Sequence, residues 1–232
     1  MPSATFFNLP DDKRQRILDC ALEEFARNDF DSASISQIVA QAGIAKGSLY
    51  QYFEDKRDLY LYLVQLAGEE KRTFLSSRPP PDPGMDVFAF LHWLIKEGAR
   101  FELSNPLLAR VAYRALFSDR PFGDAPFGEL RKVAASYYES LVAMGVAQGA
   151  IDPGIDRGLA VFLFSAVFND FGRYLLERAQ VDPQALASGA VNYQRLAVED
   201  QADELIGILK RGLAPAHARE SDVTGQELKS RL

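Results

Sequence analysis

Residues 34–59, SISQIVAQAGIAKGSLYQYFEDKRDL, bring side chains that suit DNA contact close together in the chain. A serine hydroxyl and a glutamine amide can hydrogen-bond to base edges, whereas a lysine ammonium and a tyrosine hydroxyl can bond to phosphate oxygens. Lys46, Ser48, Tyr50 and Gln51 supply these groups. We therefore expect this segment to grip DNA, and the alternative is a small helical pair with a solvated polar face.

The elements that must position these groups follow from the apolar spacing. Ile35, Ile38, Val39 and Ala42 lie at offsets of zero, three, four and seven. This spacing predicts one apolar stripe on a helix of about two turns. Ser34 precedes the stripe and is expected to be the N-cap residue.

A sharp turn and a second helix are predicted next. Gly43 follows the last periodic residue, where a left-handed C-terminal cap costs least for a residue without a Cβ. Ile44 is expected to anchor the turn, and a second helix should begin near Lys46 with Leu49 and Phe53 facing inward. The pattern as a whole predicts a helix-turn-helix.

Gly47 and two later cations add to the expected phosphate contacts. Without a Cβ in the first turn of the second helix, the backbone can approach the sugar-phosphate chain, and the helix dipole favours an anion there. Lys56 and Arg57 begin a further helix and are expected to clamp a phosphate.

Residues 38–59 closely resemble the signature of the TetR family of bacterial transcription regulators. Upstream, residues 16–26 resemble that family's first helix, and Phe30 stands where the family usually has an aromatic residue. The resemblance implies DNA contact by Ser34, Ser36, Lys46, Gly47, Ser48, Tyr50, Tyr52 and Lys56, to which the amide of Gln51 is added on its chemistry.

Two positions depart from the family pattern. Ala45 stands where the family often has a serine or threonine that caps the second helix, and losing such a cap typically costs about 1 kcal/mol. Ser36 stands where a charged or longer polar side chain is common, which leaves the operator sequence open.

The composition is compatible with a folded DNA-binding protein but does not by itself indicate DNA binding. The chain has 232 residues, is 47% hydrophobic and can bury a substantial core in one or two domains. Its net charge is −6, and residues 1–60 hold seven Lys and Arg against ten Asp and Glu. Because affinity depends on how many phosphates are neutralised, the cluster of Lys46, Lys56 and Arg57 outweighs that sum, and non-specific binding should be weak.

Other classes of protein find little support in the sequence. Cys20 cannot form an internal disulfide and is expected to pack. With only His92 and His217 there is no metal-ligand cluster, and no catalytic motif is present, so neither an enzyme nor a cofactor or metal is expected. No apolar run reaches the roughly 18 residues that span a bilayer, and no signal peptide is evident, so a cytoplasmic protein without a membrane partner is expected.

The expected architecture is all-α, with a three-helix head over 1–56, a body over 57–213 and a polar tail over 214–232. A fourth helix over 55–76 should join head and body until the proline-rich segment 78–84 stops it. Further helices are predicted over roughly 85–103, 106–118, 125–148, 156–179 and 191–213.

The aromatic residues of the body are mostly expected to form core, but a helical bundle can also enclose a ligand. A small apolar or amphipathic effector is expected: a long acyl chain, an acyl thioester, an aromatic compound and a hydrophobic drug all stay open, and the arginines slightly favour an anionic end. Ordinary core or surface pairing is the alternative for each candidate contact: His92, Trp93, Arg110, Tyr113, Arg114, Phe117, Tyr137, Phe168, Asn169 and Arg173.

The resemblance also implies a homodimer whose interface is built by the last two long helices. The corresponding apolar residues are Phe162, Leu205, Ile208 and Leu209, and the alternative is that this strip docks onto its own body. The implied function is a dimeric repressor of a double-stranded, inverted-repeat operator, released when the effector binds, with the helix over 55–76 as the lever. A regulator fold that acts through protein contacts is the competing hypothesis.

Overall fold

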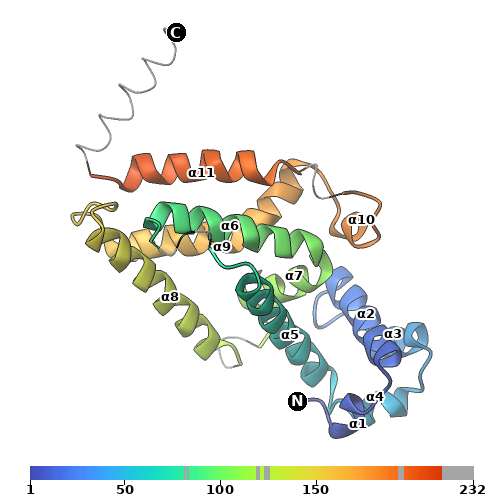
Figure 1. Cartoon of the computed structure of the whole chain (residues 1–232). Helices are drawn as coiled ribbons and strands as arrows, with labels where there is room; N and C mark the ends of the chain where they lie inside the picture. Colours follow the sequence, from blue (N-terminus) through green and yellow to red (C-terminus); the bar gives the residue numbers. More distant parts are fainter. Residues whose placement is uncertain (81, 83, 119–120, 123–125, 193–195, 216–232) are drawn as a thin grey trace. The chain divides into compact units, whose positions relative to one another are not determined.

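The computed structural model describes residues 1–80, 82, 84–118, 121–122, 126–192 and 196–215. Within these ranges the chain is helical and contains no strand, which confirms the all-α prediction (Figure 1). In chain order the elements are α1 (Ala4–Phe7), α2 (Asp11–Arg27), α3 (Ile35–Ala42), α4 (Lys46–Tyr52), α5 (Lys56–Ser76), α6 (Val87–Ser104), α7 (Pro106–Tyr113), the π-helical turn η1 (Arg114–Ser118), α8 (Gly128–Ala147), α9 (Arg157–Arg178), α10 (Pro183–Ala187) and α11 (Val198–Leu213).

The predicted helices fall on observed ones with small shifts. The segment 106–118 is divided into α7 and η1, and the last helix begins at Val198 rather than near residue 191. The short helices α1 and α10 were not predicted, because one turn leaves no apolar period to detect. The predicted tail lies outside the described residues apart from 214 and 215.

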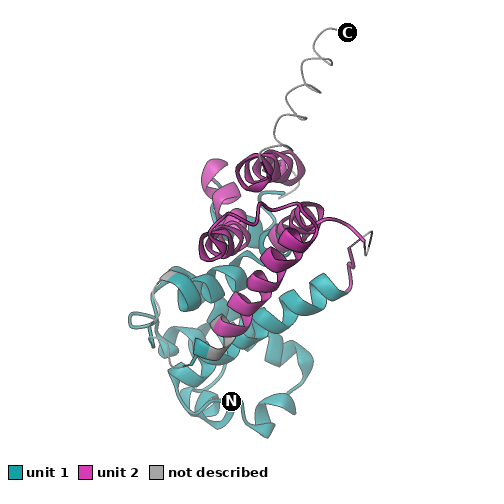
Figure 2. Cartoon of the chain, turned by 90° about the vertical axis from the view of Figure 1, so that its left-hand side faces the viewer, with its two compact units in different colours: residues 1–76, 101–128, 181–192 teal, residues 77–100, 129–180, 193–232 magenta. Residues whose placement is uncertain are grey.

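The chain forms two compact units, which Figure 2 shows in different colours. Unit 1 comprises Met1–Ser76, Phe101–Gly128 and Val181–Asn192, and unit 2 comprises Ser77–Arg100, Glu129–Gln180 and Tyr193–Leu232. The units follow contacts rather than chain order, since unit 1 takes up α7 and α10 as well as the first five helices. The predicted boundary between a head and a body at residue 56 therefore stays a prediction.

The larger of two core clusters described in unit 1 joins the helix-turn-helix to α1, α2 and α5. Phe6, Ile17, Ile38 and Leu59 are fully buried in it. Burying one such side chain contributes roughly 1.5–3 kcal/mol, so α3 is held mainly by tertiary packing. Cys20 packs against the same core, and burial raises the pKa of its thiol.

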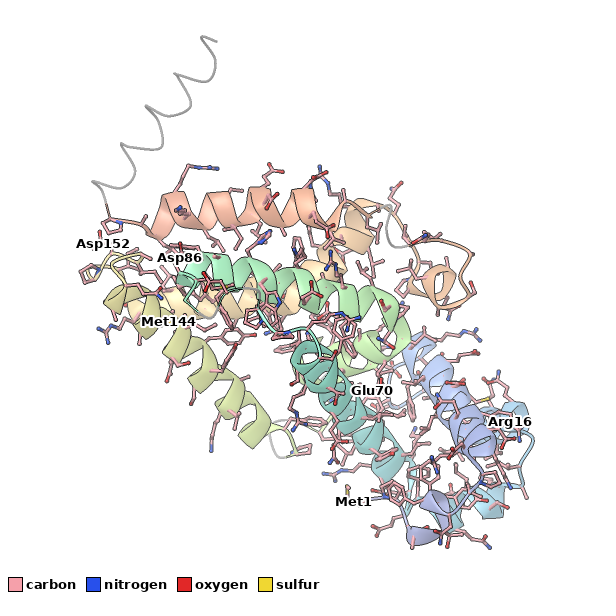
Figure 3. All side chains as sticks on the ribbon, viewed as in Figure 1. Met1, Arg16, Glu70, Asp86, Met144 and Asp152 are labelled. Atoms are coloured by element: carbon pink, nitrogen blue, oxygen red, sulfur yellow. The ribbon has the colours of Figure 1, made fainter. Side chains whose placement is uncertain are left out.

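In unit 2, helices α6, α8 and α9 meet around the ring of Phe168 on α9. A Cβ on Gly98 of α6 would lie 2.8 Å from Cε2 of Phe168, so the ring packs directly on the helix backbone. The centroid of the same ring lies 6.0 Å from that of Tyr138 on α8. Asp86, labelled in Figure 3, caps α6 by accepting hydrogen bonds from the N–H groups of Phe88 and Ala89 at 2.8 and 2.9 Å.

Helix α9 departs from one expectation. By length and composition alone, a window of 18 residues within Arg157–Arg178, with a mean hydropathy of 1.4, would be apolar enough to cross a membrane. The sequence analysis missed this because Asn169, Asp170 and Arg173 interrupt the apolar run. A helix that packs on more than one side passes the same test.

Candidate nucleic-acid interface

Helix α3 is held at both ends by α2. At its start, Oε1 of the buried Glu24 accepts a hydrogen bond from the N–H of Ser34 at 2.7 Å. At its end, Nε of Arg16, labelled in Figure 3, donates to the carbonyl of Ala42 at 3.1 Å. Both contacts satisfy backbone groups that a helix end leaves without intrahelical partners.

The caps and the turn of the helix-turn-helix agree with the sequence analysis. Oγ of Ser34 accepts a hydrogen bond from the N–H of Gln37 at 3.3 Å, which confirms the predicted N-cap. Gly43 has φ 68° and ψ 36°, the predicted left-handed cap. Ala45 precedes α4 without a side-chain cap, as its departure from the family pattern implied.

Helix α4 has one buried and one exposed side. Leu49 and Phe53 are buried as predicted. Nζ of Lys46 lies within hydrogen-bonding distance of Oγ of Ser36 on α3, at 3.4 Å, which links the exposed sides of the two helices. We call the outward groups of α3 and α4 the reading face: Ser36, Lys46, Gly47, Tyr50 and Gln51 are exposed, with the partly buried Ser48 at its edge.

Gly47 occupies open space on this face. A Cβ added to it would meet no heavy atom within 4 Å. The fold itself therefore does not require a glycine at this position. The absence of a side chain leaves the backbone of the first turn of α4 accessible, which is what a close approach to phosphate needs.

Tyr52 lies on the other side of α4, and its placement does not support the predicted DNA contact. Only 5% of its surface is exposed, and its ring centroid lies 6.1 Å from that of Phe6. Its spacing of three from Leu49 already placed it on the inward stripe. The predicted DNA contact of Tyr52 came from the family resemblance, and it stays a prediction.

Lys56 has a structural partner in the loop before α3. Its ammonium donates hydrogen bonds to the carbonyls of Asp31 and Ala33, both at 3.1 Å, and lies 4.7 Å from the ring centroid of Phe30. Two of its three N–H groups are thus used inside the protein. A phosphate contact through the third stays a prediction.

Among the predicted effector contacts in unit 1, Arg114 has a different role. Its Nη1 donates to the carbonyls of Phe25 and Asn28 at 3.4 and 2.9 Å, at the C-terminal end of α2. A cation there complements the helix dipole, and the effector contact of Arg114 stays a prediction. Arg110 is exposed, and the rings of Tyr113 and Phe117 lie 5.6 Å apart.

The candidates in unit 2 are mostly engaged with neighbours. Nε2 of His92 lies 2.9 Å from Oδ1 of Asp203. Arg173 pairs with Asp170 and Glu177 on its own helix, at 2.7 and 2.5 Å, which favours the surface-pair interpretation. Trp93 packs beside Phe90, and Phe168 packs on Gly98. Asn169 is partly buried. Tyr137 is 42% exposed, and the burial of the rest of the side chain raises the pKa of its phenol.

The predicted dimer residues divide into two groups. Phe162 on α9 and Ile208 on α11 are 62% and 54% exposed, which is unusual for side chains of this size. Leu205 is partly buried, and Leu209 is buried in unit 2. For Leu209 the alternative interpretation, docking onto its own body, fits the structure.

The sequence analysis did not predict that Glu24 and Arg16 would bond the two ends of α3. Glu24 falls on the inward stripe of α2, with Ile17, Ala21 and Phe25, where a carboxylate is unusual. A charged residue at an apolar position could have indicated a buried hydrogen-bonding role.

A helix-turn-helix whose second helix is polar and accessible, within a larger helical chain, defines a helix-turn-helix DNA-binding protein. Residues 17–63 match the family model described as "Bacterial regulatory proteins, tetR family", and residues 85–214 match "Tetracyclin repressor-like, C-terminal domain". The chain belongs to the TetR family, and its relatives are DNA-binding transcription regulators.

Solved structures and curated relatives agree with this assignment. A TetR family transcriptional regulator from Chloroflexus aurantiacus J-10-FL is 44% identical, with a TM-score of 0.82 over 93% of this chain and 99% of that one. The fatty acid metabolism regulator protein of Bacillus subtilis (strain 168) is 25% identical over 182 residues, 77% of this chain and 92% of that protein. A structure of FadR from Bacillus subtilis in complex with stearoyl-CoA has a TM-score of 0.58 at 19% identity, over 83% and 96% of the two chains, and shows likeness of fold.

Gly47→Ala should weaken DNA binding without weakening the fold. Open space surrounds the position, and alanine favours a helix by roughly 1 kcal/mol over glycine, so the midpoint of thermal unfolding should not fall. The new methyl group would keep phosphate from the backbone, and losing a charge-assisted hydrogen bond of about 1.5–3 kcal/mol should lower affinity roughly tenfold or more. Fluorescence anisotropy with labelled duplex DNA measures this.

Gly68→Ala is the matched control for Gly47→Ala, because a Cβ on Gly68, in α5, would also meet nothing within 4 Å. It should leave DNA affinity unchanged. A loss of stability in Gly47→Ala would show that this glycine is structural instead.

Lys56→Ala should lower the stability of the protein, because it removes two hydrogen bonds from a charged donor to the loop before α3. We expect a loss of about 1–2 kcal/mol in urea unfolding. Lys46→Ala, which removes an exposed ammonium, should leave stability unchanged and reduce the salt slope of DNA binding by about one. If Lys56→Ala also reduces the slope, its third N–H contacts phosphate; unchanged stability would contradict the structural role.

Proposed function

We propose that this protein is a homodimeric transcriptional repressor that binds an inverted-repeat operator through the reading face and releases it when an amphipathic effector binds. It would act in the bacterial cytoplasm, as its relatives are transcription regulators. A two-fold axis would present two copies of α4 to successive major grooves, so the operator should have two half-sites about one helical turn apart.

The observation that carries the proposal is the division of α4 into a buried and an accessible side. Leu49 and Tyr52 are buried in the core, whereas Lys46, Tyr50 and Gln51 are exposed together. A helix kept only for packing would have no need of this combination of a cation, a phenol and an amide. All three can donate hydrogen bonds to DNA.

Apolar side chains exposed on α9 and α11 support a dimer. Leu159, Phe162 and Ile208 are each more than half exposed. Grouped on helices that the family uses for association, they are better explained by a second copy of the chain than by solvent. The same contact would account for the apolar composition of α9.

A long-chain acyl thioester is the effector that we place first among those left open by the sequence. A curated relative that covers most of this chain is named a regulator of fatty acid metabolism, and a FadR structure with this fold holds stearoyl-CoA. An acyl chain suits an aromatic-rich helical body, and the anionic coenzyme end suits basic side chains at its surface.

The experiment that tests the proposal is selection of fragmented genomic DNA by the pure protein, followed by sequencing. We expect enrichment of an inverted repeat by the natural chain and its loss in a variant with Lys46→Ala and Tyr50→Phe. Enrichment of no sequence at any salt concentration would favour the hypothesis that the fold acts through protein contacts.

Titration with acyl-CoA thioesters of increasing chain length then tests the effector on the recovered operator. A coupling of about 1–3 kcal/mol would weaken operator binding roughly 5- to 150-fold, and the operator must weaken effector binding equally. Titrations with free coenzyme A and with the free fatty acid show how much each end of the thioester contributes to the effect. Unchanged operator affinity with every thioester would reject this effector class and leave the operator result standing.

Phe162→Glu should dissociate the dimer, because it places a charge on an exposed apolar side chain that we expect to be buried between copies. Light scattering should then give the monomer mass, and affinity for the full operator should approach that for a half-site. Val133→Glu is the control, since Val133 is similarly exposed, at 67%, but lies on α8. Dimers in both variants would reject the proposed interface.

A further inference from the structure

The C-terminal end of α4 is completed from outside the helix-turn-helix. Helix α4 has seven residues, and the N–H of Phe53 closes its last intrahelical bond to the carbonyl of Leu49 at 2.9 Å. The carbonyls of Gln51 and Tyr52 therefore lack partners within α4, as at every helix end. A helix this short is not stable alone, so contacts at its ends decide where it lies.

Ser3 supplies partners for both carbonyls. Its backbone N–H donates to the carbonyl of Tyr52 at 2.8 Å, and its Oγ donates to the carbonyl of Gln51 at 2.6 Å. One residue at the start of the chain thus caps the helix that carries Tyr50 and Gln51. Its own backbone is extended, with φ −72° and ψ 161°.

Residues 2–9, which we call the N-terminal segment, are fixed to the rest of unit 1 beyond Ser3. Phe6 is fully buried, and its ring centroid lies 4.8 Å from that of Phe53 and 5.8 Å from that of Tyr62. Arg14 of α2 donates to the carbonyls of Phe7 and Leu9 at 3.1 and 3.4 Å. Ser3 is therefore presented to α4 by a packed element and not by a free end.

The N-terminal segment lies outside residues 17–63, the part of the chain that matches the tetR family model. The family assignment therefore says nothing about the role of this segment. Aromatic packing alone would account for Phe6, but it would not require two hydrogen bonds aimed at the end of α4.

We propose that the N-terminal segment positions the recognition helix for sequence reading, with Ser3 as the positioning residue. The inference rests on the proposed function, because it assigns the segment a role in operator recognition. Base contacts require the reading groups to be held within a fraction of an ångström, whereas attraction to phosphate tolerates displacement. Loss of the Ser3 contacts should therefore reduce specific binding more than non-specific binding.

The test compares Ser3→Ala, Ser3→Thr and Ser3→Pro in the full-length protein. Alanine removes the Oγ contact, threonine keeps a hydroxyl, and proline removes both donors at a φ that it can adopt. Ser140→Ala is the matched control, since Oγ of Ser140 also donates to a backbone carbonyl, that of Tyr137 at 2.7 Å, but in unit 2.

Two measurements are made on each variant: the ratio of operator affinity to random-duplex affinity, and the hydrogen exchange of the α4 amides. For Ser3→Ala we expect the ratio to fall roughly fivefold and the α4 amides to exchange about fivefold faster, the equivalent of one hydrogen bond. Ser3→Pro should show larger changes, and Ser3→Thr and Ser140→Ala should resemble the natural chain.

Each other outcome overturns the inference. Unchanged exchange of α4 in Ser3→Pro would show that Ser3 does not hold the helix. Faster exchange with an unchanged affinity ratio would make the contact structural only, and an equal loss of specific and random binding would indicate general unfolding. If the natural chain selects no sequence, the proposed function fails, whereas the exchange data still report whether Ser3 holds α4.

Discussion

The helix-turn-helix depends on two contacts that fix α3 between residues of α2. Glu24 bonds the start of α3 at Ser34 and Arg16 bonds its end at Ala42. The two residues on each helix are eight positions apart, which at a rise of 1.5 Å per residue is about 12 Å on both. Because the later residue of α2 bonds the start of α3 and the earlier one bonds its end, the two helices run in opposite directions with matched spacing. The turn at Gly43 and the whole of α4 follow from α3, so the placement of the reading face begins at these two polar contacts on an otherwise apolar interface.

Helix α4 shows why such fixing is needed. It has seven residues and no side-chain cap at Ala45, so little of its stability can be intrinsic. Its order comes from burial of Leu49 and Phe53 and from the bonds that Ser3 makes to its last carbonyls. A recognition element ordered before it meets DNA loses less conformational freedom on binding. Tertiary contacts therefore supply the stability that the local sequence of α4 lacks, and they offset the missing side-chain cap at Ala45.

Local features were predictable from the sequence and long-range ones were not. The stripe of α3, the cap at Ser34 and the left-handed Gly43 involve neighbours within a few residues, and all three are confirmed. The expected contacts of Lys56 with DNA and of Arg114 with effector stay predictions, but the sequence did not indicate the bonds that these side chains make to the carbonyls of Ala33 and Asn28. Nothing in the spacing of a chain reveals which distant helix end will need a cation. Tyr52 is a different case, because its spacing of three from Leu49 already indicated the buried position that the structure shows.

The acidic composition of the first 60 residues is compatible with DNA binding because many of those carboxylates are committed to the protein. Glu24 is buried against the N–H of Ser34, and Asp58 is buried and accepts from the N–H of Glu54 at 3.1 Å. Asp11 pairs with Arg14 at 2.7 Å. Charges more than roughly 8 Å from a phosphate are also largely screened at physiological salt. In the proposed function, the charge nearest to DNA is that of the reading face, where Lys46 is exposed. In the proposed function, a reading face with a single lysine gives little attraction to phosphate, so recognition depends on how accurately α2, α3 and Ser3 hold α4.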